Sequence, residues 1–284
     1  MSRVESAPDT IIEAPDFNLA LTLNSGQVFH WMEIDGWWEG VIGARFCAVR
    51  ESNGNLEFRG NVAASDVMRY FSLDHPMEQI RASFPGDSFS QAALHACKGL
   101  RIIRQPEWEC LATFITSSMK QVAHIRQMSL AIRSRYGAPV NGSEINAYPE
   151  PAILSKLAEG DLRDCGLGFR AKSLLGASRV IAHGEVDLRA LRSIKTSVAR
   201  EVLCSVPGVG VKVANCVLLF AYERLDAVPV DVWIDRILRA MRRNRPASPA
   251  QLQKYSERRL GPYAGYVQQY LFHHARVSKT LPQR

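Results

Sequence analysis

The chain has 284 residues, 46% of them hydrophobic and 22% charged, which is typical of a folded protein with room for two domains. No apolar run approaches the roughly 20 residues that span a bilayer, and the first residues lack the basic start and apolar core of a signal peptide. These features exclude a mainly disordered or membrane-spanning protein. We expect an intracellular protein with no membrane partner.

The positive charge is concentrated near the C-terminus. The net charge is +7, yet residues 231–284 alone carry 11 lysines and arginines against three acidic residues. Their net charge of +8 leaves the first 230 residues at −1. Such clustering favours a polyanionic partner, because lysine and arginine release counterions from a phosphate backbone. A solvated basic helix face is the alternative.

The pattern of apolar residues predicts two kinds of structure in chain order. Residues 17–59 alternate apolar and polar positions and contain turn signals at 24–26, 35–36 and 52–55, which predicts an antiparallel sheet. After residue 63 the apolar period changes to about 3.6, which predicts helices separated by proline and glycine. The fold class is therefore α+β.

The same pattern suggests domain boundaries. We expect an N-terminal tail over residues 1–15 and an antiparallel-sheet domain with following helices over 16–105. A helical body is expected over 106–276, followed by a C-terminal tail over 277–284. Within the body, a helix-hairpin-helix is expected at about 198–220.

The segment Pro207-Gly208-Val209-Gly210 predicts that hairpin, with glycines that permit positive φ. The second helix has an apolar stripe, and Lys212 lies in its first turn, off the stripe. The stripe comprises Val213, Cys216, Val217 and Phe220. The backbone amides of such a hairpin can bind a phosphate, although close packing of two helices also requires glycine.

Asp231 precedes an amphipathic run through Ile234, Ile237 and Leu238, where it is placed as a helix N-cap. Capping alone would explain this aspartate. However, Asp231 follows Lys212 by 19 residues, so a helix, a loop and the next helix start can bring the carboxylate and the amine together.

The hairpin, Lys212 and Val-Pro-Val-Asp231 together resemble the helix-hairpin-helix (HhH-GPD) DNA glycosylase superfamily, in its lysine-bearing branch. Further segments resemble 8-oxoguanine DNA glycosylase/lyases, in that family's order: residues 24–31, 114–118, 165–171 and 261–272. The resemblance implies an N-terminal antiparallel sheet domain like the TATA-box-binding protein, packed against an all-helical glycosylase body.

The resemblance also implies the reaction, which is base excision with associated abasic-site lyase activity. The neutral amine of Lys212 would attack the anomeric carbon, and the resulting Schiff base would permit strand cleavage by β-elimination. Desolvation in a pocket favours the neutral amine. Asp231 would stabilise the cationic sugar. Without the resemblance, an exposed structural lysine is the simpler interpretation.

The same resemblance assigns residues to the recognition of the damaged base. Gln268 and Phe272 are four residues apart and share one helix face, so an amide and a ring can read a flipped base. Phe272 would stack on one side of the base and Cys216 would line the other. The carbonyl of Gly26 would accept the N7 hydrogen that 8-oxoguanine carries and guanine lacks. Core positions and a turn are the alternatives.

The resemblance assigns further contacts with double-stranded DNA to Met119, His124, Phe169, Arg170, Gly208, Gly210, Val211 and Trp233. Well-known eukaryotic members have three asparagines and an arginine at positions that here hold Met119, Lys120, Gln121 and His124. Met119 can fill the gap left by the base, but it offers no directed donor to the orphaned cytosine. Of the two arginines that read that cytosine in the family, only the one matching Arg170 is present. Phe169 beside it would act as a stacking wedge. We therefore expect relaxed opposite-base specificity.

No cofactor is expected for catalysis. The six cysteines include no CxxC pair and no cluster after Asp231, which argues against an iron–sulfur cluster and favours reduced thiols. The resemblance allows a structural cation held by the backbone carbonyls of Cys204, Val206 and Val209. The adjacent His273 and His274 point about 100° apart on a helix, which favours solvent or phosphate contacts over a metal.

Two other functions remain open. One is a related glycosylase for ring-opened or alkylated purines, and the other is a DNA-binding module without catalytic activity. The substrate expected here is double-stranded DNA containing 8-oxoguanine, bound by a monomer in a bacterial cytoplasm or nucleoid or in a eukaryotic nucleus.

Overall fold

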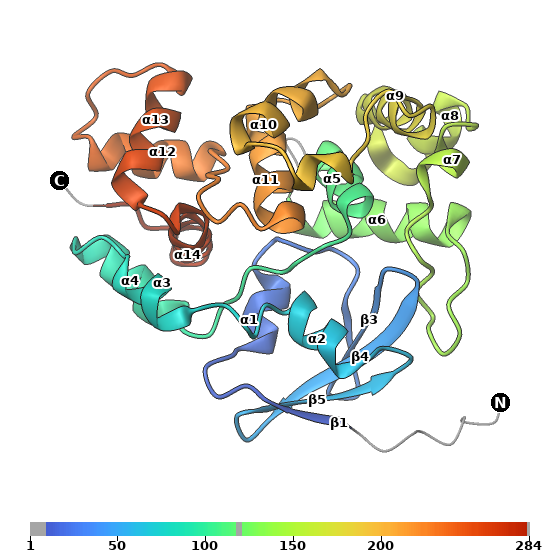
Figure 1. Cartoon of the computed structure of the whole chain (residues 1–284), viewed down its shortest axis with the longest axis horizontal. Helices are drawn as coiled ribbons and strands as arrows, with labels where there is room; N and C mark the ends of the chain where they lie inside the picture. Colours follow the sequence, from blue (N-terminus) through green and yellow to red (C-terminus); the bar gives the residue numbers. More distant parts are fainter. Residues whose placement is uncertain (1–9, 118–120, 283–284) are drawn as a thin grey trace.

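The computed structural model of the chain describes residues 10–117 and 121–282. A five-stranded sheet lies at one end of the molecule, and helices build the rest (Figure 1). The predicted α+β class is confirmed. Over the described ranges, none of the helices combines the length and the apolar content that crossing a membrane requires.

The sheet is antiparallel throughout, with the strand order β1-β5-β4-β3-β2. Two of its hairpins have left-handed residues at both central positions, Asp35-Gly36 and Asn53-Gly54. This conformation matches the twist of paired strands and confirms both predicted turns. The strands are β1 (Thr10–Glu13), β2 (Met32–Ile34), β3 (Trp37–Ile42), β4 (Arg45–Ser52) and β5 (Asn55–Gly60).

Two elements near the N-terminus differ from the prediction. Strand β1 lies inside the segment expected as a tail, because Ile12 is buried and pairs with β5. Helix α1 (Leu19–Asn24) replaces part of the expected sheet. Asn18 caps this helix by accepting a hydrogen bond from the amide of Leu21 at 2.8 Å. The leucines at alternate positions imitate a strand and conceal the helix.

Most of the remaining described residues form helices joined by loops, the longest of which spans residues 137–150 (Figure 1). The helical elements are α2 (Ala64–Tyr70), α3 (Met77–Ala82), α4 (Ser88–Ala96), α5 (Glu107–Thr116), α6 (Val122–Tyr136), α7 (Pro151–Leu154), α8 (Glu159–Leu162), a π-helix (Arg163–Leu167), α9 (Arg170–Ala182), a 3-10 turn (Ala190–Arg192), α10 (Thr196–Ser205), α11 (Val211–Tyr222), α12 (Val232–Met241), α13 (Pro249–Leu260) and α14 (Ala264–Ser278).

Two main cores hold these elements. The smaller core joins the sheet to α1 and α2 and includes Trp31 and Phe71. The larger core lies among the helices, and α3 and α4 contribute Ile80 and Ala93 to it although they precede residue 106. Helix α4 packs beside α14, the last helix of the body (Figure 1).

Helix α11 is deeply buried in the larger core. Every residue from Val213 to Tyr222 is buried, so the burial extends beyond the predicted apolar stripe to all faces. The helix packs against α5 and α10, and the ring of Phe220 stacks on Phe114 with centroids 5.3 Å apart. Burial on all sides fixes the position of both helix ends.

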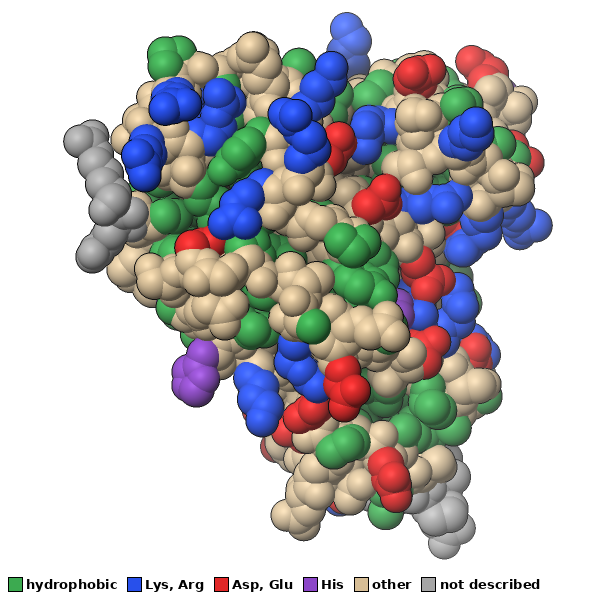
Figure 2. Space-filling model, turned by 60° about the vertical axis from the view of Figure 1, so that its left-hand side comes forward, with side chains coloured by type: hydrophobic (Ala, Val, Ile, Leu, Met, Phe, Trp, Pro, Cys, Tyr) green, Lys and Arg blue, Asp and Glu red, His purple; other side chains and the backbone are tan. Residues whose placement is uncertain are grey.

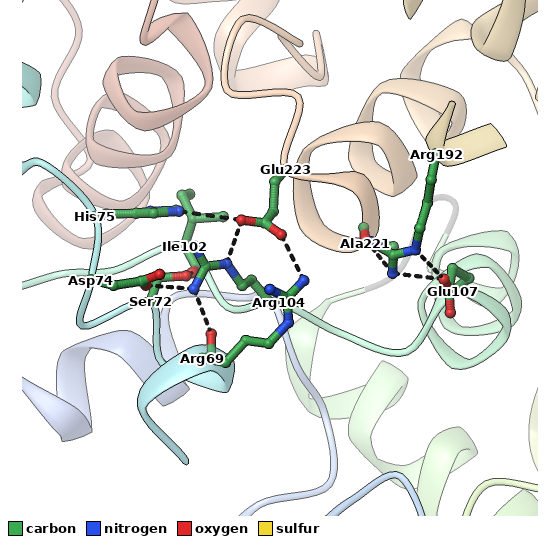
Figure 3. Close-up of polar contacts among 10 residues, drawn as sticks. All are labelled: Arg69, Ser72, Asp74, His75, Ile102, Arg104, Glu107, Arg192, Ala221 and Glu223. Carbon is green, nitrogen blue, oxygen red and sulfur yellow. Dashed lines mark hydrogen bonds and ion pairs between the residues drawn. The ribbon is translucent and has the colours of Figure 1, made fainter. Parts of the chain in front are cut away.

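The C-terminal end of α11 is tied to the sheet domain by an ion-pair network around Glu223 (Figure 3). The carboxylate of Glu223 accepts hydrogen bonds from the guanidinium groups of Arg69 and Arg104, and His75 lies 3.7 Å away. Arg104 also pairs with Asp74. His75 and the two arginines lower the pKa of Glu223 to about 2.

Replacing Glu223 with glutamine should make stability less dependent on pH. A lowered folded-state pKa stabilises the native state above the unfolded pKa of about 4.3, and this contribution disappears as pH falls toward 2. At pH 7 we expect Glu223→Gln to lose about 1 to 2 kcal/mol, because solvent screens part of the network. Urea unfolding from pH 7 to pH 2.5 measures the difference.

The matched control is Glu201→Gln, which neutralises an exposed carboxylate on α10. It should follow the unsubstituted chain at every pH. A stability loss in Glu223→Gln that stays constant down to pH 2.5 would contradict the electrostatic account of this junction.

Candidate active site

A pocket lies where α5, α11, the start of α12 and α14 meet the turn after α1. All six residues predicted to act in catalysis and base recognition line it. The lining residues are Gly26, Phe114, Lys212, Cys216, Phe220, Pro229, Asp231, Gln268, Gln269 and Phe272. The pocket adjoins a larger groove that shares Lys212, Asp231 and Phe272 with it.

The predicted helix-hairpin-helix is confirmed, since α10 and α11 flank the glycine turn. Gly208 has a φ of +82°, and a Cβ there would lie 2.5 Å from the side chain of Ser173. Both conformation and space therefore require glycine. Gly210 differs from the prediction, because it caps α11 in an extended conformation with a φ of −100°.

Lys212 is a half-buried residue, the second of α11, so the buried helix places its side chain at the pocket. Its Nζ lies 5.4 Å from the centroid of the Phe114 ring. The face of an aromatic ring attracts a cation and excludes water from one side. Phe114, for which the sequence suggested no role of its own, therefore shapes the surroundings of the amine.

Asp231 is the N-cap of α12, as predicted, and its Oδ1 accepts a hydrogen bond from the amide of Ile234 at 2.8 Å. Its side chain also lines the pocket. Burial raises the pKa of the Asp231 carboxyl, while the Ile234 amide and the charge of Lys212 act in the opposite direction. The capping role and the pocket role thus belong to the same carboxylate.

Gln268 and Phe272 project from α14 one turn apart into the pocket. Gln268 is only 3% exposed, and its buried amide oxygen has no hydrogen-bond partner in the part of the chain that the structure describes. A buried acceptor without a partner costs free energy, so this oxygen is suited to a ligand that donates a hydrogen bond.

Cys216 and Gly26 form further parts of the pocket wall. Burial raises the pKa of the Cys216 thiol to about 11 against the opposing charge of Lys212, so the thiol is neutral at physiological pH. Gly26 has a φ of +88°, and a Cβ there would lie 3.5 Å from the Phe272 ring. Glycine at this turn keeps the aromatic wall close to the backbone.

The residues predicted to read the opposite strand lie outside the pocket. Phe169 is 64% exposed before α9, which suits a stacking wedge. Arg170 is only 5% exposed, with its guanidinium carbon 4.3 Å from the centroid of the Phe169 ring. A contact between Arg170 and a cytosine would require this side chain to move outward. Met119 lies outside the described residues.

Of the other predicted DNA contacts, Val211 and Trp233 line the groove. Val211 is 50% exposed beside Gly208 and Gly210 at the hairpin, and His124 is exposed in the first turn of α6. Trp233 lines the groove, with the guanidinium of Arg236 5.7 Å from its ring centroid. On the face drawn in Figure 2, lysine and arginine side chains gather over the upper part.

The fit of a cation at the hairpin depends on carbonyl oxygens. Val206 already accepts a hydrogen bond from the amide of Val209 at 3.1 Å, which leaves one lone pair on its oxygen. Across residues 10–117 and 121–282, histidine, cysteine and acidic side chains form no cluster of three that could hold a metal. Any cation here would depend on carbonyls, including those of Cys204 and Val209.

Comparison with known proteins identifies the family. Residues 10–111 match the family model of the 8-oxoguanine DNA glycosylase N-terminal domain. A probable N-glycosylase/DNA lyase of Methanothermobacter thermautotrophicus is 32% identical, and the alignment covers 95% of this chain and 97% of the relative.

Two solved structures share the whole fold. MBOgg1 in complex with a low-affinity DNA ligand has 32% identity and a TM-score of 0.90, with 98% of each chain covered. The Clostridium acetobutylicum 8-oxoguanine glycosylase/lyase, bound to double-stranded DNA with cytosine opposite 8-oxoG, has 26% identity and a TM-score of 0.90 over 98% of this chain and 99% of that one. The chain therefore belongs to the 8-oxoguanine DNA N-glycosylase/lyase family of the helix-hairpin-helix superfamily.

Proposed function

We propose that this protein removes 8-oxoguanine from double-stranded DNA and nicks the strand at the resulting abasic site. The observation that carries the proposal is the convergence in one pocket of the Lys212 amine, the Asp231 carboxylate and the Gln268 amide oxygen, which has no hydrogen-bond partner among the described residues. The Clostridium relative, which was solved with cytosine opposite 8-oxoG, supports the substrate.

The pocket suits a base that has left the duplex. Such a base loses stacking and pairing, and the protein must replace both. The ring of Phe272 and the neutral thiol of Cys216 would cover its two faces, while the amide of Gln268 pairs with its Watson–Crick edge. The carbonyl of Gly26 would accept the N7 hydrogen of 8-oxoguanine and would repel the N7 lone pair of guanine.

The chemistry begins when the neutral Lys212 amine attacks the anomeric carbon. The N-glycosidic bond breaks, its electron pair leaves with the base, and the positive charge of the sugar passes to the nitrogen. Opening of the sugar ring, with one of the amine protons passing to the ring oxygen, then gives a Schiff base. Loss of a proton from the adjacent C2′ carbon expels the 3′ phosphate. Asp231 would stabilise the cationic sugar in the transition state.

The hairpin and the basic C-terminal region would hold the duplex. The exposed amides around Gly208 and Gly210 can bind one phosphate, and a cation on the carbonyls of Cys204, Val206 and Val209 could bridge to it. Catalysis itself needs no cofactor in this scheme, and a monomer contains every group that it uses.

Lys212→Gln should abolish both base release and borohydride trapping on an 8-oxoguanine duplex, because an amide cannot form the covalent intermediate. Binding of the same duplex should survive, since glutamine still fills the mouth of the pocket. Gel-based base release, trapping and a binding titration measure the three effects. Retained trapping would falsify the role of Lys212.

Asp231 allows its two roles to be separated. Asparagine also caps helices, so Asp231→Asn should keep the melting temperature and slow base release by about 100-fold. Asp231→Ala should lose the cap as well and destabilise the protein by about 1 kcal/mol. Thermal melting and single-turnover rates measure the pair. If Asp231→Asn releases the base as fast as the unsubstituted chain, Asp231 acts only as the helix cap.

The residues expected to contact the base opposite 8-oxoguanine predict weak discrimination among the four bases at that position. Loss of one bidentate contact costs about 1 to 3 kcal/mol, or roughly tenfold to a hundredfold in rate ratio. We therefore expect 8-oxoguanine to be removed opposite all four bases, with only a modest preference for cytosine. Single-turnover cleavage of four duplexes tests this. A strong cytosine preference that survives Arg170→Ala would contradict it.

A further inference from the structure

The turn that carries Gly26 is held by α14 at two successive carbonyls. Nη2 of Arg276 donates to the carbonyl of Asn24 at 2.8 Å, and Nε2 of Gln269 donates to the carbonyl of Ser25 at 3.0 Å. On α14, Gln269 precedes Phe272 by three residues and Arg276 follows it by four, so all three share one face. The two donors therefore bracket the aromatic wall of the pocket.

Arg276 also contacts that wall directly. Its guanidinium carbon lies 5.2 Å from the centroid of the Phe272 ring, within the range of a cation–π contact. Phe272 lines both the pocket and the groove, whereas Arg276 is not among the described residues that line either. The guanidinium thus supports the ring from outside the space that a base would occupy.

The orientation of Arg276 is fixed by a third partner. Nδ1 of His273 lies 3.3 Å from Nη2 of Arg276. Burial, Arg276 and His274 together lower the pKa of His273 to about 4, so the imidazole is neutral at working pH and can accept a hydrogen bond. Arg276 therefore keeps its contacts across the pH range in which such an enzyme acts.

Gly26 is closely packed against side chains of α14. A Cβ built on Gly26 would lie 3.2 Å from Nη1 of Arg276 and 3.5 Å from the Phe272 ring. The guanidinium therefore packs against Gly26 as well as holding the carbonyl two residues before it. A shift of Arg276 would alter the distance between the Gly26 backbone and the aromatic wall.

We propose that Gln269 and Arg276 form a clamp that sets the position of the Gly26 carbonyl relative to the Phe272 ring. Arg276 is a positioning residue, since it acts on the base through Gly26 and Phe272. Gln269 also lines the pocket, and its part in the clamp is the hydrogen bond that it donates to the Ser25 carbonyl. Because that carbonyl is the group that distinguishes a protonated N7 from a lone pair, the clamp sets selectivity for 8-oxoguanine over guanine. This inference rests on the proposed function.

The test measures binding in the Lys212→Gln background, where the bound base stays attached. Dissociation constants are determined for two duplexes that differ only in 8-oxoguanine or guanine opposite cytosine. We expect Arg276→Ala and Gln269→Leu each to reduce the preference for 8-oxoguanine by about fivefold to tenfold, the worth of one hydrogen bond. Arg276→Lys keeps the charge but loses the planar fork, so it should recover only part of the preference.

Arg45→Ala is the control, because it removes an exposed arginine that pairs with Asp66 in the sheet domain. It should leave the preference unchanged. Thermal melting checks each variant, and Arg276→Met, which retains length beside Phe272, replaces the alanine variant if that one does not fold.

The outcomes separate the clamp from simpler roles. If Arg276→Ala weakens both duplexes equally, Arg276 is a general charge contact with DNA and the clamp is overturned. A Lys212→Gln parent that binds the two duplexes equally would instead overturn the proposed function. If the Lys212→Gln parent prefers the 8-oxoguanine duplex, and Arg276→Ala and Gln269→Leu reduce that preference, the clamp is supported.

Discussion

The burial of α11 on every side is the constraint on which the site depends. Each apolar side chain removed from water contributes roughly 25 cal/mol per Å², so a helix enclosed from Val213 to Tyr222 cannot rotate or slide without a large loss. Its N-terminal turn presents Lys212, and its C-terminal end presents Glu223 to the sheet domain. One rigid element therefore positions the amine and orients it relative to the Gly26 turn.

The pocket is completed by groups with two roles each. Asp231 begins α12 through its hydrogen bond to Ile234, and the same carboxylate lines the pocket near Lys212. On α14, Phe272 lines the pocket and also contacts Arg276, which holds the turn before Gly26. Because stability and recognition share these residues, a substitution must be judged by its effects on both.

Local spacing predicted the hairpin, the cap at Asp231 and the shared helix face of Gln268 and Phe272, while the family resemblance assigned their roles in the site. The structure places Asp231, Gln268 and Phe272 in one pocket. Contacts between distant segments could not be predicted in this way. Strand β1 exists only through its pairing with β5, and Arg276 reaches a carbonyl 252 residues away. The burial of Arg170 likewise depends on the packing of α9.

The central claim is that the pocket delivers the sugar of the flipped nucleotide to the amine of Lys212. Borohydride reduction of the unsubstituted protein on an 8-oxoguanine duplex, followed by digestion and mass spectrometry, identifies the lysine that carries the sugar remnant. The account predicts modification of Lys212 alone. Modification of Lys254, which lines the adjoining groove, or base release without any trapped lysine would contradict it.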